Sequence, residues 1–221
     1  MGHPVSIPTA LGPVSAWRSD PHVEPHGVLV VLQEIFGVNS HIRQVCDRFA
    51  AHRYIAVAPA LFDPVERGVE LDYDGNGVER GRDLAGRLGF DRALVVVKGV
   101  IDQFRHELPI GAVGYCWGGT VAYLANTRLN LPAVSYYGGR SVPFLHERLS
   151  APMQFHFGEH DPLIPPEDVA LHRELHADAG IHTYPAGHGF NCDQRADYDE
   201  AAATLALERT LRFFERTLRT P

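Results

Sequence analysis

The stretch GAVGYCWGGTVAYLAN (residues 111–126) sets a cysteine between glycines, directly after a short apolar run and directly before a helix-like segment. The form Gly-x-nucleophile-x-Gly is typical of a sharp turn from a strand into a helix, which displays the central side chain. A buried cysteine in a glycine-rich turn also fits this motif taken alone. The stretch predicts a strand at 110–115, a helix at 118–127, and Cys116 at a helix N-terminus, whose positive end favours a thiolate.

Strand-like and helix-like segments alternate on both sides of this stretch. Further strands are predicted at 27–34, 54–60, 132–138, 152–158 and 181–186, and further helices at 40–52, 90–106, 166–179 and 198–218. Alternation predicts an α/β fold with a mostly parallel sheet and helices on both of its faces. The first ~20 residues predict an antiparallel strand or hairpin at one sheet edge. Residues 62–89, rich in Gly, Asp and Arg, predict an irregular excursion with one short helix near 78–87.

Composition narrows the class of protein. The 221 residues are expected to form a single domain over 1–221, and their net charge of 20 − 27 = −7 disfavours nucleic acid as a partner. No apolar run approaches the length of a membrane span, so no membrane association is expected. Three cysteines are too few, and odd in number, for a disulfide framework, which predicts a reducing, cytoplasmic environment.

The loops beyond the carboxyl ends of parallel strands are where sites gather in such sheets. Asp161, in FGEHDPLIP (157–165), follows a strand end and a glycine, where a carboxylate can orient a histidine. An Asx-turn also fits Asp161, and Glu159 is a nearby rival. His188, in YPAGHGFNC (184–192), lies between two glycines after the last strand. The order Cys116, Asp161, His188 is the nucleophile, acid and base order of α/β-hydrolases, so we predict a catalytic triad.

A fourth strand end carries QEIFGVN (33–39). Glu34 follows a very apolar run, where a carboxylate is either buried with a partner or displayed in a site. The loop after this strand supplies one oxyanion-hole N–H in α/β-hydrolases. The sequence therefore predicts an oxyanion hole built from the main-chain N–H groups of Ile35 and Trp117.

Taken together, QEIFGVN, GYCWGG, GEHDPLIP and AGHGF, which span residues 33 to 190, resemble the dienelactone hydrolase family, the carboxymethylenebutenolidases. The resemblance implies an α/β-hydrolase fold, no metal, no cofactor, and a small ester or lactone substrate opened by a cysteine nucleophile. It implies Cys116 as nucleophile, His188 as base and Asp161 as the residue that orients His188. It also implies that Glu34 contacts the resting thiol and takes its proton when substrate arrives. Both a monomer and a dimer remain open.

The substrate-binding residues that the resemblance implies match this sequence less completely than the catalytic residues do. The resemblance implies two arginines that hold a substrate carboxylate, one of them four residues beyond the catalytic histidine. That place holds Cys192 here, and Arg195 is the candidate to replace the missing arginine by a different route. The second arginine lies in the irregular segment, and a tyrosine follows from the YYG stretch. The predicted substrate-binding residues are Phe36, Arg82, Tyr136 and Arg195, with Arg80 a rival to Arg82.

Three functions are compatible with these residues. The first is hydrolysis of dienelactone or another enol-lactone or aryl ester, with little activity on alkyl esters, since a thiolate leaves a tetrahedral intermediate more readily than an alkoxide does. The second is a related thiol hydrolase of another activated ester without dienelactone specificity, which Cys192 in the arginine's place favours. The third is a non-enzymatic redox sensor that pairs Cys116 with Cys192, but it leaves Asp161 and Glu34 unexplained.

One further pattern resembles a metal site. HRELH (172–176) places two histidines four residues apart on a predicted helix. Its glutamate stands at the third position rather than the second position of zincins, and no third ligand is evident. We therefore expect a solvated helix face here and no metal.

Overall fold

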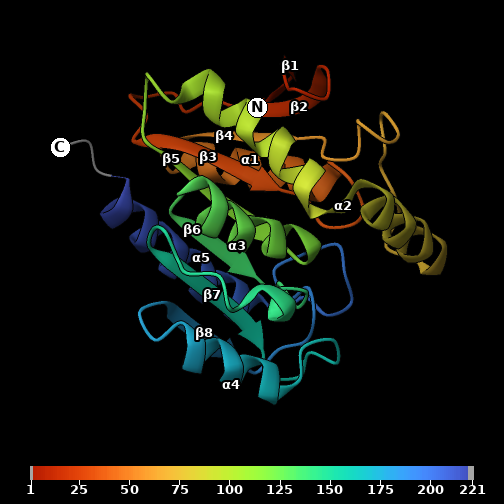
Figure 1. Cartoon of the computed structure of the whole chain (residues 1–221), viewed down its shortest axis with the longest axis vertical. Helices are drawn as coiled ribbons and strands as arrows, with labels where there is room; N and C mark the ends of the chain where they lie inside the picture. Colours follow the sequence, from red (N-terminus) through yellow and green to blue (C-terminus); the bar gives the residue numbers. More distant parts are fainter. Residues whose placement is uncertain (1, 219–221) are drawn as a thin grey trace.

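The computed structural model of the protein describes residues 2–218. Within this range eight strands form one sheet in the order β1-β2-β4-β3-β5-β6-β7-β8 (Figure 1). The first two strands pair antiparallel, as do β2 and β4, and the remaining pairs are parallel. The predicted mostly parallel sheet with an antiparallel edge is confirmed. The strands are β1 (His3–Ile7), β2 (Val14–Ser19), β3 (Gly27–Leu32), β4 (Tyr54–Pro59), β5 (Ile110–Tyr115), β6 (Ala133–Tyr136), β7 (Met153–Gly158) and β8 (Gly180–Tyr184).

Helices cover both faces of this sheet. In Figure 1, α2 and α3 lie in front of the strands and α5 lies behind them. Strands β3 to β7 are buried along their whole length, which explains why they read as continuous apolar runs rather than alternating ones. None of the described helices is long and apolar enough to cross a membrane. The helices are α1 (Ser40–Ala51), α2 (Gly75–Phe104), α3 (Trp117–Leu129), α4 (Pro166–Leu175) and α5 (Glu200–Thr217), with one 3₁₀ turn at Val142–Phe144.

The segment expected to be irregular is largely helical. Helix α2 begins at Gly75 and runs to Phe104, with a break at Gly89, where φ is 71° and ψ is 164°. The Asp74 side chain caps it by accepting a 2.7 Å hydrogen bond from the N–H of Gly77. The short helix predicted near 78–87 is present, and it starts three residues earlier, at Gly75. Arg82 lies on this helix, within the stretch that the sequence predicts to be helical.

The expectation of a solvated face for HRELH was wrong. His172 and His176 are both buried. The Nε2 atom of His172 lies 2.7 Å from Ser141 Oγ, and that of His176 lies 3.0 Å from Tyr123 Oη. Together with Val169 they occupy spacings i, i+3 and i+7, which is the inward stripe of a helix. Both imidazoles are therefore part of the packing between α4 and the sheet, each bonded to a protein hydroxyl.

The parallel strands bring distant loops to one edge of the sheet. Leu32 at the end of β3 aligns with Gly114 in β5, and Tyr115 at the end of β5 aligns with Tyr136 at the end of β6. Gly158 at the end of β7 aligns with Tyr184 at the end of β8. The segments that follow these strands therefore share the carboxyl edge, where parallel sheets form their sites.

Candidate active site

Cys116 stands on a strained turn between β5 and α3. Its φ is +53° and its ψ is −118°, a conformation that side chains larger than glycine rarely adopt. The turn is tight because a Cβ on Gly114 would lie 1.9 Å from the carbonyl oxygen of Gly118, and a Cβ on Gly118 would lie 2.3 Å from that of Gln33. The flanking glycines are thus required by close backbone approach. The turn presents the Cys116 side chain at the start of α3.

The structure brings the three predicted triad residues together. Cys116 Sγ lies 3.2 Å from His188 Nε2, and His188 Nδ1 lies 2.7 Å from Asp161 Oδ2. The other oxygen of Asp161 accepts a 2.8 Å hydrogen bond from the N–H of Leu163, which fixes the carboxylate. Asp161 and His188 are buried, whereas Glu159, the rival carboxylate, is exposed.

The surroundings of His188 keep a proton on its ring. Burial alone would lower the pKa of His188, but the hydrogen bonds to Asp161 and Cys116, with the charges of both, raise the pKa from 6.5 to about 10. At neutral pH the imidazole is therefore positively charged. A cation 3.2 Å from the sulfur is the setting that favours a reactive thiolate.

Glu34 is held by two residues on the other side of the site. Its carboxylate is buried and accepts hydrogen bonds from Arg195 Nη1 at 3.3 Å and from Tyr73 Oη at 3.2 Å. The Arg195 guanidinium also lies over the rings of Phe36 and Tyr73, at 5.9 Å and 5.7 Å from their centroids. A contact between Glu34 and the thiol, which the resemblance implies, is not among the hydrogen bonds of the described residues. In this arrangement the sulfur of Cys116 lies against His188 instead.

A cavity of ≈ 340 Å³ opens beside the sulfur, a size suited to a small-molecule ligand. The predicted residues Phe36, Arg82 and Arg195 line it, together with Ile35 and Trp117 of the predicted oxyanion hole. Sequence reasoning missed several other lining residues. They are Val78, Tyr137, Gly139, Arg140 and Leu163.

Tyr136 is not at the cavity, which corrects one predicted substrate contact. It is the last residue of β6 and fully buried, and its Oη lies 2.7 Å from Thr210 Oγ1 on α5. Tyr137, the next residue, lines the cavity with a φ of +40°. Its hydroxyl is buried and has no hydrogen-bond partner among residues 2–218. Successive side chains of a strand point to opposite faces of the sheet. Tyr136 therefore points toward α5, whereas Tyr137, one residue later, lines the cavity.

Arg140 and Tyr137 could have been found from the sequence. They follow β6, which ends at the same edge as the strands that precede Cys116, Asp161 and His188. The rule that sites gather beyond the carboxyl ends of parallel strands selected four loops, and it applies equally to the loop after β6. Arg80, the rival to Arg82, forms a surface ion pair with Glu66 and does not line the cavity.

Comparison with known proteins decides the family. The sequence pattern described as the Dienelactone hydrolase family matches residues 14–218. The chain belongs to the dienelactone hydrolase family. The carboxymethylenebutenolidase of Pseudomonas putida is 33% identical to this family member over 212 residues, covering 87% of each chain. The protein is thus a hydrolase of the carboxymethylenebutenolidase type.

Solved structures share the fold of this protein. A Klebsiella pneumoniae protein, provisionally named a dienelactone hydrolase, superposes with a TM-score of 0.85 at 28% identity, covering 98% of each chain. A Pyrococcus furiosus esterase reaches a TM-score of 0.66 at 13% identity, over 99% of this chain and 93% of its own. The second likeness concerns the fold alone.

The other two cysteines lie away from the cavity. Cys46 is fully buried in α1, as its place on an apolar stripe predicts. Cys192, at the place where the resemblance implies an arginine, is fully buried and does not line the cavity. Its sulfur forms a cluster with His41 and Asp193, the one group among the described residues whose donor atoms suit a metal ion.

Proposed function

We propose that the protein hydrolyses an activated carboxylic ester or enol-lactone that carries a carboxylate, through a thioester on Cys116. The observation that supports this most strongly is the chain of contacts at the cavity. Sulfur and imidazole are 3.2 Å apart, and imidazole and carboxylate are 2.7 Å apart. This is the arrangement of a nucleophile, a base and the group that orients the base.

In the first half-reaction the thiolate attacks the carbonyl carbon, and the carbonyl oxygen becomes an oxyanion. The main-chain N–H groups of Ile35 and Trp117, both at the cavity, are the proposed donors to that oxygen. Trp117 is the first residue of α3, so its N–H has no acceptor within the helix and is available to the substrate. Loss of one such donor typically costs ~2.7–4 kcal/mol of transition-state stabilisation.

The thioester forms when the ring carbon–oxygen bond breaks. The enolate oxygen leaves with that electron pair and takes a proton from the His188 imidazolium. The neutral imidazole then accepts a proton from water, whose oxygen attacks the thioester carbon, and Cys116 leaves as a thiolate. An alkoxide is a poorer leaving group than the thiolate, so an alkyl ester returns to starting material. An enolate or aryloxide leaves more easily, which limits the substrates to activated esters.

The cavity's charge favours an anionic substrate. Arg82, Arg140 and Arg195 line it, and guanidinium groups bind carboxylates through paired hydrogen bonds. Arg195 is shared with Glu34, and no hydrogen bond of Arg82 or Arg140 is seen within residues 2–218. We therefore assign the substrate carboxylate to Arg82 and Arg140, with Tyr137 as a hydroxyl donor at the same wall.

A second candidate is hydrolysis of an activated ester without a carboxylate, and Cys192 in the place of the family arginine favours it. Rates for dienelactone and for an uncharged aryl ester separate the two. We expect Arg82→Gln and Arg140→Gln each to lower kcat/KM for dienelactone about 10–100-fold, since a charge-assisted hydrogen bond contributes about 1.5–3 kcal/mol. Rates on the aryl ester should change little, and Arg80→Gln, on the surface, should change neither. Equal losses on both esters would favour the second candidate.

The nucleophile is tested by Cys116→Ala assayed beside wild type with an aryl ester. Wild type should show a burst of aryloxide and an acyl mass adduct on Cys116, and the variant should show neither. Equal rates in the two proteins would remove Cys116 from the mechanism. A Cys116–Cys192 disulfide trapped by mild oxidant, with no burst in the reduced protein, would instead support the redox sensor.

A further inference from the structure

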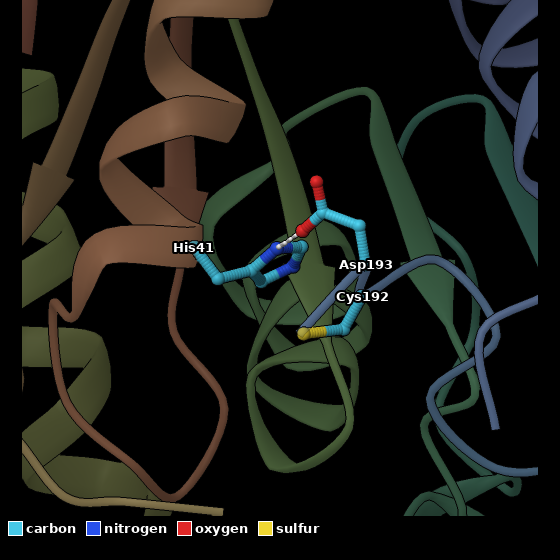
Figure 2. A group of neighbouring side chains, drawn as sticks. All are labelled: His41, Cys192 and Asp193. Carbon is cyan, nitrogen blue, oxygen red and sulfur yellow. Dashed lines mark ion pairs between the residues drawn. The ribbon is translucent and has the colours of Figure 1, made fainter. Parts of the chain in front are cut away.

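A second cluster of reactive side chains lies outside the cavity, where α1 meets the loop after β8. His41 stands in the first turn of α1, and Cys192 and Asp193 stand on the loop that also carries His188 and Arg195. Figure 2 shows the imidazole of His41 between the carboxylate of Asp193 and the sulfur of Cys192. One donor atom from each residue lies within 4.8 Å of the others.

The imidazole of His41 is buried without a hydrogen-bond partner in the described part of the chain, and an ion pair with Asp193 is the charged contact that the structure gives it. The residue has no exposed surface, and neither ring nitrogen has a hydrogen-bond partner among the described residues. The nearest carboxylate oxygen, on Asp193, lies 3.6 Å from Nδ1, beyond hydrogen-bond distance. A neutral imidazole carries one N–H and one lone pair, and buried polar atoms of this kind are nearly always paired in folded proteins. The unpaired ring points to a ligand bound between these side chains.

We propose that this cluster binds a transition-metal ion of the Zn²⁺ class through a ring nitrogen of His41, the thiolate of Cys192 and the carboxylate of Asp193. One imidazole, one thiolate and one carboxylate are the nitrogen, sulfur and oxygen donors that Zn²⁺ accepts, with a water molecule in the fourth position. Bond lengths of about 2.0–2.3 Å place tetrahedral donors roughly 3.5 Å apart. The His41 and Asp193 donors, 3.6 Å apart, are already near that separation. All three donors lie within 4.8 Å of one another, so any remaining closure is about an ångström, and the half-exposed Asp193 side chain has room to move.

Binding would fix the loop that carries the catalytic histidine. The N–H of Cys192 donates to the carbonyl of Gly189 at 2.9 Å, and the N–H of Arg195 donates to the carbonyl of Cys192 at 3.1 Å. A metal ion would join this turn to α1 between His188 and Arg195. On binding, the S–H bond of Cys192 breaks, a sulfur–metal bond forms, and one proton passes to solvent.

The experiment needs a background in which the catalytic pair cannot bind the metal, because Cys116 and His188 also offer sulfur and nitrogen 3.2 Å apart. We therefore use Cys116→Ala and titrate it with Co²⁺. The expected result is one saturable ion per chain, with a thiolate-to-cobalt charge-transfer band and one proton released per ion. Zn²⁺ should displace the Co²⁺ and raise the melting temperature.

Two matched variants in the Cys116→Ala background assign the ligand. Cys192→Ser should abolish the charge-transfer band and the Zn²⁺ effect on melting, whereas Cys46→Ser, which removes the other buried thiol, should keep both. Asp193→Asn is exposed enough not to disturb folding and should weaken Co²⁺ binding at least about tenfold, since even indirect ligand contacts contribute 10–100-fold.

The inference is overturned if Cys116→Ala shows no saturable Co²⁺ band, or if the band survives Cys192→Ser. It is also overturned if Asp193→Asn binds Co²⁺ as tightly as the parent. Because the parent variant lacks the proposed nucleophile, these outcomes do not depend on hydrolysis and leave the proposed function untouched.

Discussion

Two buried histidines, one in β7 and one on the loop after β8, behave in opposite ways. His156, in β7, lies 2.7 Å from Tyr184 Oη, 2.9 Å from Gln154 Nε2 and 3.1 Å from Thr210 Oγ1. Burial lowers its pKa well below 6.5, and the nearby His182 and Arg209 lower the pKa further. His188, after β8, is also buried, yet its pKa is raised to about 10.

The difference lies in the partners rather than in burial. Burial disfavours the charged ring at both places, but Asp161 and Cys116 supply groups at His188 that can be negative, whereas the partners of His156 are neutral. One histidine keeps its proton beside the cavity, and the other is a neutral hydrogen-bonding group in the core.

Asp161→Asn should have the largest effect, because the amide removes the charge that raises the pKa of His188 and no longer fixes its tautomer. We expect kcat/KM for an activated ester to fall about 10³–10⁴-fold. Asp178→Asn, at an exposed carboxylate, serves as the control and should leave the rate unchanged. Circular dichroism should show both variants folded. A loss of less than tenfold would contradict the orienting role of Asp161.

His156→Gln should act on stability and leave the chemistry intact. It removes at least one of the three ring contacts with neutral groups, so the free energy of unfolding should fall by about 1–3 kcal/mol. Urea denaturation measures the fall, and kcat/KM at a pH where the variant is folded should stay within about twofold of wild type. A large loss of rate in a stably folded variant would show that His156 takes part in the reaction.

The two histidines should give opposite pH dependences of stability. A raised pKa means that His188 stabilises the fold fully below pH 6.5 and loses this contribution as pH rises toward about 10. The lowered pKa of His156 means that its contribution is present above pH 6.5 and is lost as pH falls. Unfolding free energies of wild type, His188→Gln and His156→Gln across pH test this. The difference in unfolding free energy between wild type and His188→Gln should shrink at alkaline pH. The difference between wild type and His156→Gln should shrink at acidic pH. Differences that do not change with pH would contradict both pKa assignments.

The adjacent tyrosines should show the smallest difference. Tyr137→Phe removes the buried hydroxyl, unpaired within residues 2–218, of a residue that lines the cavity, so KM for dienelactone should rise about 3–10-fold, the equivalent of one hydrogen bond. Tyr136→Phe removes a hydroxyl bonded to Thr210 and should lower the unfolding free energy by about 1 kcal/mol without changing KM. If KM changes in Tyr136→Phe and not in Tyr137→Phe, Tyr136 is the substrate contact, as the sequence predicted.

The sequence predicts which loops lie at the ends of strands, but it does not predict the direction in which each side chain points. The loops of Cys116, Asp161 and His188 were predicted because residue order and strand position agree. Tyr136 was chosen over Tyr137 because sequence does not show at which residue β6 ends.

Tertiary packing accounts for the other errors. The glycines of α2 disfavour a helix by propensity. A Cβ on Gly81 would lie 2.3 Å from the carbonyl oxygen of Ile35, so the helix needs a glycine there to approach the loop after β3. His41 and Cys192 carry no shared motif, and only the fold brings them together.

The central claim is that sulfur, imidazole and carboxylate act as one unit that holds a proton on His188. Its most direct test is an NMR titration of the histidine ring resonances of the resting enzyme, with His156 as internal control and Cys116→Ala as comparison. The account predicts that His188 stays protonated until pH approaches about 10, that its pKa falls in Cys116→Ala, and that His156 stays neutral near pH 6. A His188 ring that titrates at or below pH 6.5 in wild type would contradict the account.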